Sequence, residues 1–325
     1  QLIKIFILKL SIHLLFKIIR KRKQFRIDNL IIIDTFVFPG YVNNDRYYNG
    51  LIQSLPEKYL NKIYFVPTIV LAGFKEIYSI VKEIRNSSRP FLLKEDLLTT
   101  HDIVSSFFHY FRVKRLKLPI MEEDEINFSP IFKKEISQTK ASSLIIDGFL
   151  TYAFFERCKK RKFKIDSVVD WWENQPIDKA LHRALADFYP KAHSISYLGY
   201  APRSSELHLF PSKQELENKV VPRNIGVIGS GFVNEIKKFN QELKVLSSPA
   251  FRFNYLWNDL PSEKRKRKFI FVALPVTLED SLYVLKLTIK SLEKFKKEDI
   301  KVLVKLHHTM KKRLYRSETN KMIGG

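Results

Sequence analysis

The fold expected for this chain is indicated most clearly by residues Ser167-Val168-Val169-Asp170-Trp171-Trp172-Glu173-Asn174-Gln175-Pro176. The first residues of this stretch are short and apolar, as in a buried strand, and Pro176 begins a helical pattern that continues to Tyr189. A second strand is predicted at 194–197. A strand, a helix and a strand in this order indicate a parallel sheet. The polar and aromatic residues between strand and helix then lie at the carboxyl edge of the sheet, where open α/β proteins bind ligands.

The same alternation of strands and helices extends along the chain on both sides of this stretch. Strands are predicted at 29–34, 62–70, 208–212 and 222–228, helices at 45–54, 74–85 and 94–111, and a less regular segment at 116–139. A basic run at 264–268 reads as a linker. It is followed by a strand, a helix and a strand at 269–274, 281–294 and 301–305. The sequence therefore predicts a first α/β domain over 27–263 and the start of a second, incomplete one over 264–325.

Charge and cysteine content narrow the classes of partner. The chain has 57 Lys and Arg against 34 Asp and Glu, a formal net charge of +23, which favours an anionic partner. A nucleic-acid-binding protein is one reading, but the basic runs are not interleaved with aromatics as in known modules, and we expect no nucleic-acid partner. Cys158 is the only cysteine and the histidines form no ligand pattern with nearby carboxylates, so we expect no disulfide within the chain and no structural metal.

The N-terminal residues 1–26 are apolar but carry eight Lys or Arg and no acidic residue. Lys4, Lys9 and Lys17 interrupt the apolar run, which argues against a helix that crosses a bilayer. The pattern favours a basic helix lying on an anionic membrane surface, and thus a cytoplasmic protein peripheral to the inner face of the cytoplasmic membrane. A helix buried in the first domain, or a remnant signal or anchor segment, are the alternatives.

The cluster after Val169 supplies the candidate catalytic residues. Asp170 or Glu173 is suited to remove a proton from a sugar hydroxyl, while Trp171, Asn174 and Gln175 are suited to bind the sugar by stacking and hydrogen bonds. The structural alternative is that both tryptophans belong to the core and that Glu173 or Asp178 caps the following helix.

Three cations are candidates for binding an anionic donor. Arg252 lies between aromatics in Pro249-Ala250-Phe251-Arg252-Phe253, where either phosphate recognition or stacking in the core fits. Lys305 and His307 directly follow the predicted strand at 302–304, so they are expected at a carboxyl edge, where a cation and an imidazole suit a phosphate leaving group. The alternative is a pair of surface histidines, His307 and His308.

Several motifs resemble those of bacterial surface carbohydrate proteins, of the O-antigen or capsule type. The matching stretches are Ile32-Ile33-Asp34-Thr35-Phe36-Val37-Phe38, Asp45-Arg46-Tyr47-Tyr48, Leu93-Lys94-Glu95-Asp96, Val169 to Asp178, Val221 to Gly229 and Pro249 to Phe253. The resemblance implies a GT-B-like architecture of two Rossmann-type domains with parallel sheets, the C-terminal one truncated. It also implies transfer of a sugar from a nucleotide-sugar, bound as substrate with no resident cofactor, to a surface polysaccharide or lipid-linked glycan. Asp34 and Arg46 are then expected to contact substrate.

A more distant similarity concerns Lys305-Leu306-His307-His308. It is similar to the Lys-Pro-His-Pro element of Kdo transferases and CDP-glycerol glycerophosphotransferases, with Leu306 and His308 in place of the prolines. This similarity keeps open a polyol-phosphate transferase of cell-envelope polymer synthesis. A non-catalytic scaffold for polysaccharide assembly is the remaining alternative, and the truncated chain is not expected to be fully active by itself.

Overall fold

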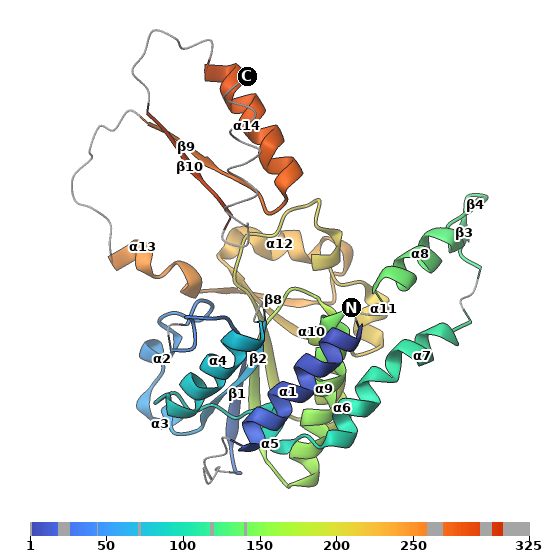
Figure 1. Ribbon diagram of the computed structural model, residues 1–325, viewed down its shortest axis with the longest axis vertical. Coiled ribbons are helices and arrows are strands. Elements are labelled where there is room, and N and C mark those ends of the chain that lie inside the picture. The colour runs from blue at the N-terminus through green and yellow to red at the C-terminus, as the bar shows by residue number, and fades with distance from the viewer. Residues whose placement is uncertain are drawn as a thin grey trace. The chain divides into compact units, whose positions relative to one another are not determined.

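The computed structural model describes residues 2–18, 27–43, 45–70, 73–117, 120–139, 142–258, 269–292 and 301–307. The chain divides into two compact units, residues 1–259 and 260–325, against a predicted boundary after residue 263. The basic runs at 20–23 and 264–268 lie outside the described residues, as does His308. Figure 1 shows the elements of both units.

The first unit is built on a six-stranded parallel sheet. Its strands are β1 (Leu30–Val37), β2 (Ile63–Ile69), β5 (Ile165–Trp171), β6 (His193–Leu198), β7 (Asn224–Ile228) and β8 (Lys244–Ser248), in the spatial order β2-β1-β5-β6-β7-β8. The parallel α/β sheet expected from the sequence is thus confirmed. The chain forms β2 on one side of β1 and β5 on the other, so the strand order reverses between β1 and β5. That reversal is where such sheets open a ligand crevice at their carboxyl ends.

Helices cover both faces of this sheet. They are α1 (Leu2–Ile18), α2 (Leu51–Ser54), α3 (Glu57–Leu60), α4 (Phe74–Asn86), α5 (Lys94–Leu97), α6 (Thr100–Phe107), α7 (His109–Lys114), α8 (Ser129–Thr139), α9 (Ser143–Lys160), α10 (Pro176–Phe188), α11 (Lys213–Glu217), α12 (Val233–Ile236) and α13 (Tyr255–Asn258). Single 3₁₀ turns occur at Leu207–Leu209, Ser230–Phe232, Lys237–Phe239 and Phe251–Phe253.

The core consists of separate apolar clusters on the two faces. Leu30, Ile32 and Val168 of the sheet pack against α9 and α10, whereas Ile33 and Phe65 face α4. This division follows from the pleat, because successive residues of a strand point to opposite faces. A third cluster around Trp172, Val227 and Val245 fills the β7–β8 end of the sheet.

Helix α1 packs on the first unit and joins its two main clusters. Leu2, Ile5 and Phe6 pack against the α9–α10 cluster, and Ile12 and Phe16 are buried in the α4 cluster. Of the interpretations of this segment, the structure therefore bears out a helix docked on the first domain, with one face left open to solvent. Among the described residues, no helix has both the length and the apolar character needed to cross a bilayer.

Three predicted elements differ in the structure. The single helix expected at 94–111 is broken, because Thr99 caps a new helix by accepting the backbone N–H of Asp102. The helix expected at 45–54 is reduced to α2, and 208–212 contains a 3₁₀ turn rather than a strand. The segment at 116–139 follows α7 and contains the hairpin strands β3 (Glu122–Glu123) and β4 (Ile126–Asn127) and helix α8, which project as an arm in Figure 1.

The second unit contains a parallel strand pair and one helix. Strands β9 (Phe269–Ala273) and β10 (Lys301–Lys305) pair in parallel, and α14 (Leu278–Leu292) lies between them in the sequence. Val272, Leu274 and Leu285 form a small buried cluster between the strands and the helix. This is the strand, helix and strand order expected for the start of an α/β domain.

Candidate active site at the carboxyl edge of the sheet

Three successive residues at the end of β5 have different surroundings. Asp170 pairs in register with Ser196 and points to the face covered by α10. Trp171 points to the opposite face, among the aromatic residues of the α4 cluster. Trp172 belongs to the third cluster at the β7–β8 end. The end of β5 and the residue that follows it therefore place three successive side chains in the interior, and Glu173 is the first residue beyond them.

Asp170 lies in a buried hydrogen-bonded network. The Ser196 hydroxyl donates to Asp170 Oδ1 at 2.6 Å and lies 3.0 Å from His182 Nε2. His182 Nε2 is also 3.4 Å from Asp170 Oδ2. Asp170 and Ser196 are fully buried and His182 is almost so. Because no solvent reaches Asp170, the prediction that it acts as a base on an acceptor is wrong for this structure, and its position is that of a core residue.

A second buried charge cluster surrounds Asp34 of β1. Lys94 Nζ donates to the hydroxyls of Thr68 and Thr151 at 2.7 and 2.8 Å and lies 3.9 Å from Asp34 Oδ1. Burial raises the pKa of Asp34 to about 7; nearby Asp170 also raises it, and Lys94 opposes both. Asp34 is 2 % exposed, so the expected contact with substrate is contradicted.

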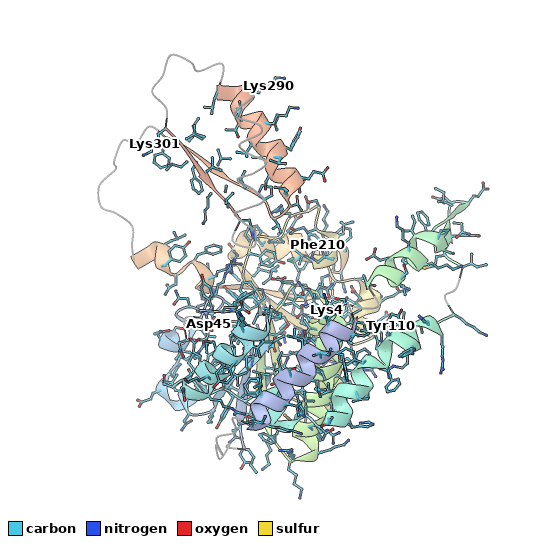
Figure 2. All side chains as sticks on the ribbon, viewed as in Figure 1. Lys4, Asp45, Tyr110, Phe210, Lys290 and Lys301 are labelled. Atoms are coloured by element: carbon cyan, nitrogen blue, oxygen red, sulfur yellow. The ribbon has the colours of Figure 1, made fainter. Side chains whose placement is uncertain are left out.

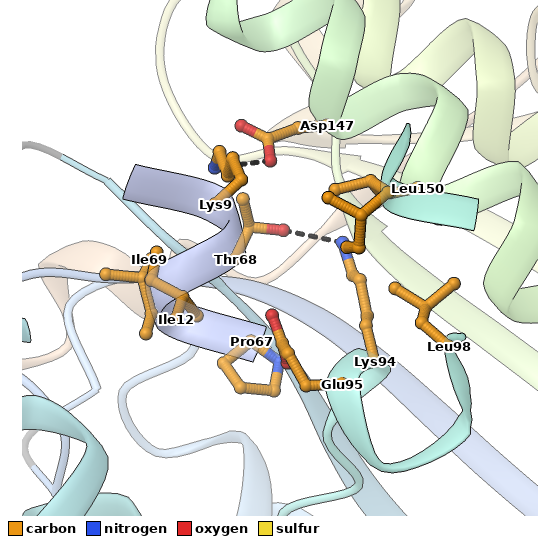
Figure 3. A pocket seen from close by; sticks show the side chains of 11 residues that line it. Lys9, Ile12, Pro67, Thr68, Ile69, Lys94, Glu95, Leu98, Asp147 and Leu150 are labelled. Carbon is orange, nitrogen blue, oxygen red and sulfur yellow. Dashed lines mark hydrogen bonds and ion pairs between the residues drawn. The ribbon is translucent and has the colours of Figure 1, made fainter. Parts of the chain in front are cut away.

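Figure 3 shows the small cavity beside this cluster. Lys9 of α1 pairs with Asp147 of α9 at 2.5 Å across it, and Lys94 reaches Thr68 on its other side. The cavity encloses about 20 Å³, enough for a single water molecule and too little for a sugar. Burial raises the pKa of Glu95, which also lines it. The cavity is a gap in a buried ionic network.

The first turn of α10 is capped by Asp178. Its carboxylate accepts the backbone N–H groups of Glu173 at 3.0 Å and Gln175 at 2.9 Å. Burial raises the pKa of Asp178 well above its usual range, and the nearby Asp170 raises it further. Of the two capping residues considered, Asp178 is therefore the cap. This leaves the Glu173 side chain for other contacts.

The tryptophans and Asn174 are structural. Trp171 is fully buried, with ring centroids 4.4 Å from Tyr47 and 5.7 Å from Tyr197. A Cβ on Gly199 would lie 2.1 Å from Trp171 Cζ3, so glycine is needed there. Asn174 is buried at a positive φ of 54° and donates from Nδ2 to the carbonyl of His208 at 2.7 Å. Sugar stacking on Trp171 and sugar binding by Asn174 are thus contradicted, since neither side chain reaches the surface.

Glu173 remains half-buried at the edge of the sheet, and two donors fix its carboxylate. Trp171 Nε1 donates to Oε1 and Gln175 Nε2 donates to Oε2, each at 2.7 Å. Each oxygen keeps a further lone pair that can accept a proton or a hydrogen bond. The predicted pair Glu173 and Gln175 therefore lies together at the position where a base would meet a ligand.

Arg46 reaches this region from the loop after β1. The loop is held by Asp45, whose Oδ1 accepts the backbone N–H groups of Tyr47 and Tyr48 at 2.8 and 2.9 Å and whose Oδ2 pairs with Arg89 at 2.7 Å. The Arg46 guanidinium lies 5.8 Å from the centroid of the Phe38 ring. This positions a half-buried cation at the carboxyl end of β1.

Arg252 reaches the same region from the segment after β8. Tyr197 anchors that segment, because its hydroxyl donates to the Pro249 carbonyl at 2.8 Å and accepts the Phe251 N–H at 3.0 Å. The Arg252 guanidinium lies 5.6 Å from the centroid of a Trp171 ring. The stacking alternative for Arg252 is thus observed, and the half-buried side chain keeps donors for a ligand.

The charges of Glu173, Arg46 and Arg252 all affect the pKa of the Tyr47 hydroxyl. The pKa of Tyr47 is raised to about 12, first by burial and then by the Glu173 carboxylate, while Arg46 and Arg252 act in the opposite direction. Burial also raises the pKa of Tyr200, with a contribution from Glu173 and an opposing one from Arg252. The carboxylate and the two guanidinium groups therefore surround the same aromatic patch, although Arg46 and Arg252 are over 200 residues apart in the sequence.

Lys305 and His307 belong to the second unit, which is described by itself. Lys305 ends β10, and its carbonyl accepts the Leu274 N–H at 2.9 Å. The expected placement of Lys305 and His307 at the end of a parallel strand is confirmed. Their role in binding a donor stays a prediction.

A groove at the opposite edge of the sheet was not predicted. It encloses about 640 Å³ beside the amino ends of β6, β7 and β8, with His182 and the end of α10 in its lining. Its cations are Lys191, Lys219, Arg223 and Lys244, and His193 also lines it. The sequence signal was a basic residue at or just before the start of each of these strands. Glu217 and Glu242 in the lining partly balance the charge.

Neither a metal site nor a similar known protein helps to identify the function of this edge of the sheet. Within the described residues, no group of three or more His, Cys, Asp or Glu side chains is arranged to hold a metal ion. Comparison with protein families, curated proteins and solved structures finds no match for this chain.

Proposed function

We propose that this chain is a glycosyltransferase that moves a sugar from a nucleotide-sugar to a surface polysaccharide or lipid-linked glycan. The observation that carries the proposal is Glu173, whose half-buried carboxylate is held by two donors at the carboxyl edge, close to the strand reversal. Arg46 and Arg252 supply positive charge around the same patch. A fixed carboxylate beside cations suits an acceptor hydroxyl that attacks an anionic donor.

In the proposed reaction Glu173 is the general base. It takes the proton of the acceptor hydroxyl while that oxygen forms a bond to the sugar carbon of the donor. The bond from that carbon to the donor phosphate breaks, and the nucleotide leaves with the electron pair. The hydrogen bonds from Trp171 and Gln175 fix the orientation of the carboxylate before the acceptor arrives, which lowers the cost of reaching the reactive geometry.

The cations are assigned to the donor. Arg252 and Arg46 offer planar guanidinium groups, which bind phosphate oxygens in pairs. Lys305 and His307 of the second unit, at the end of β10, are proposed to bind phosphate oxygens of an anionic donor, as expected for a GT-B-like protein with two Rossmann-type domains. No resident cofactor is needed, since the nucleotide-sugar is itself a substrate. The proposed location is peripheral, on the inner face of the cytoplasmic membrane, where lipid-linked acceptors lie.

The experiment has a binding step and a turnover step on the full-length protein. Thermal shifts with UDP-, GDP-, CMP- and CDP-linked sugars identify the donor class, because a ligand that binds only the folded state raises its stability. Turnover is then followed as nucleotide release, with the product identified by mass. We expect Glu173→Gln to lower turnover about 100-fold or more with little change in donor affinity.

Glu206→Gln is the matched control. Glu206 is also half-buried and also acts on Tyr200, but its ion pair with Arg203 is a long contact of 4.0 Å. We expect this variant to keep its turnover. Equal turnover of Glu173→Gln and the unaltered protein would refute the base assignment. A product that gains a phosphodiester instead of a glycosidic bond would replace sugar transfer by polyol-phosphate transfer.

A further inference from the structure

Helix α1 has an apolar stripe on its outer face. Ile3, Ile7, Leu14 and Ile18 are 74, 48, 46 and 79 % exposed. Their spacings of four, seven and four residues place them on one side of the helix. A soluble helix normally carries polar residues on the side that faces water, so this stripe requires an explanation.

The stripe is not an unfinished part of the core. The inner side of α1 is already fixed by the buried pair Lys9–Asp147 and by Arg85, whose Nη2 donates to the carbonyl of Phe16 at 3.1 Å. Ile12 and Phe16 are buried on that side. Rotating the helix to hide the outer residues would break these contacts. The outer stripe therefore stays exposed while the helix is docked.

The apolar surface continues on the neighbouring helix. Phe6 of α1 packs edge-on against Phe107 at 4.6 Å, which brings the start of α7 next to α1. Phe108 and Phe111, both more than half exposed, lie at this end of α7. Figure 2 shows Lys4 of α1 and Tyr110 of α7 close to each other in the view. Exposed apolar side chains therefore occur both on the outer face of α1 and at the start of α7, which follows α6 directly.

The charged side chains of α1 and α7 themselves all have one sign, and the acidic residues at 122–125 lie beyond α7 in the hairpin of β3 and β4. Neither α1 nor α7 contains an acidic residue. Lys4 and Lys17 are exposed on α1, and Arg112 and Lys114 on α7, with further exposed cations at Arg115 and Lys117. Asp102 of the intervening α6 is buried and paired with Arg157 at 2.7 Å, so it does not offset this charge at the surface. The surface is therefore apolar with a cationic border.

We propose that this face of α1 and α7 lies on an anionic lipid bilayer. The exposed isoleucine, leucine and phenylalanine side chains enter the boundary between headgroups and acyl chains, and the lysine and arginine side chains extend to the lipid phosphates. The charge selects this occupant, since a second copy of the chain would bring the same cations against each other. The proposal specifies the surface for the peripheral location proposed above, and it does not depend on transferase activity.

The test measures binding of the full-length protein to vesicles by flotation. Vesicles contain phosphatidylcholine alone or with one-third phosphatidylglycerol. We expect binding only to the anionic vesicles, and weaker binding when sodium chloride is raised from 50 to 500 mM, because salt screens the attraction. The combined change Ile7→Asp and Leu14→Asp is expected to weaken binding at least tenfold.

Two variants make the result specific. Leu207→Asp changes a side chain that is 65 % exposed in a 3₁₀ turn far along the sequence, and it is expected to keep vesicle binding. The combined change Lys4→Gln and Lys17→Gln alters only exposed cations, so we expect the fold to be retained. Vesicle binding by this variant should depend less on salt. The proposal is overturned if the unaltered protein binds no vesicle, or if Leu207→Asp loses binding equally. A dimer that dissociates on Ile7→Asp and Leu14→Asp, with no vesicle binding, would show that a second copy covers this face.

Discussion

Asp170 and Glu173 lie three residues apart at the same sheet edge, yet their surroundings are opposite. Asp170 is fully buried and bound by Ser196, next to a histidine. Glu173 is half-buried, and its carboxylate is held by the indole N–H of Trp171 and the amide of Gln175. The first carboxylate is part of the core, whereas the second is presented at the edge. A carboxylate at the end of a strand is thus a candidate base only if the pleat leaves it near the surface.

Asp170 is one of a group of buried acidic residues, from which Glu173 differs by its exposure. Asp34, Asp170 and Asp178 lie under the carboxyl edge, with Lys94 and His182 as the nearby cationic or titratable partners and Tyr48 among them. Such a group is costly to bury, and its members hold strands β1 and β5 and the start of α10 in one arrangement. We interpret it as the support that positions Glu173. Substitutions in this group should therefore lower the stability of the fold, whereas a substitution of Glu173 should lower turnover.

Removal of Lys94 should have the largest effect on stability. Lys94→Met leaves Asp34 without its nearest cation and the hydroxyls of Thr68 and Thr151 without their donor. We expect a loss of about 3–5 kcal/mol in the free energy of unfolding, measured with urea. Lys179→Met is the control, because Lys179 pairs with Glu215 at a partly exposed position and should cost less than about 1 kcal/mol. Similar losses for the two variants would contradict the buried network.

The pH dependence of stability should report Asp34. Its pKa is about 7 in the folded protein against 3.8 for the free group, so between these values the folded state holds a proton that the unfolded state has released. Stability therefore falls as pH rises from about 4 to about 7, by up to roughly 4 kcal/mol. Asp34→Asn cannot titrate, so the unaltered protein should lose stability relative to this variant across that range. A difference that stays constant with pH would show that Asp34 is not held protonated.

The packing of Trp171 predicts a smaller effect. Gly199→Ala places a methyl group against the indole ring, and we expect a loss of about 1–3 kcal/mol in unfolding free energy. Gly231→Ala is the matched control, since a Cβ there meets no atom within 4 Å. Because Trp171 also orients Glu173, the first variant should lower turnover as well, and the second should leave it unchanged. Equal stability of the two alanine variants would show that the space around Trp171 is not limiting.

The sequence predicted most of the sheet because strand signals are local. The apolar runs of β1, β2 and β5, and Pro176 at the start of α10, were sufficient for the order of elements and for the carboxyl edge. The buried network was not predictable in this way. Lys94 meets Thr151, 57 residues later, and Asp170 meets Ser196, 26 residues later, only through strand register and helix packing. The motif residues Asp34, Asp170, Trp171 and Asn174 were therefore assigned to substrate although they support the site from within.

The groove at the amino edge was missed for a related reason. Lys191, His193, Arg223 and Lys244 are separated along the chain and come together only because β6, β7 and β8 are parallel neighbours. Each reads in the sequence as an ordinary solvated charge. The two edges differ in construction: the carboxyl edge has fixed, hydrogen-bonded groups, whereas the charged residues in the lining of the groove are exposed. This difference is why the proposed chemistry is assigned to the carboxyl edge.

Glu173→Gln should have the smallest effect on stability, despite the large effect expected on turnover. The amide oxygen of glutamine can still accept the N–H of Trp171, and Gln175 can turn its amide to offer its oxygen to the new donor. We expect a change below about 1 kcal/mol in unfolding free energy, against a clearly larger loss for Asp170→Asn, which would disturb the contact with Ser196 and His182. Urea unfolding of the two variants under the same conditions makes this comparison. If Glu173→Gln were as destabilising as Asp170→Asn, Glu173 would belong to the support as well, and a loss of turnover in that variant would no longer identify it as the base.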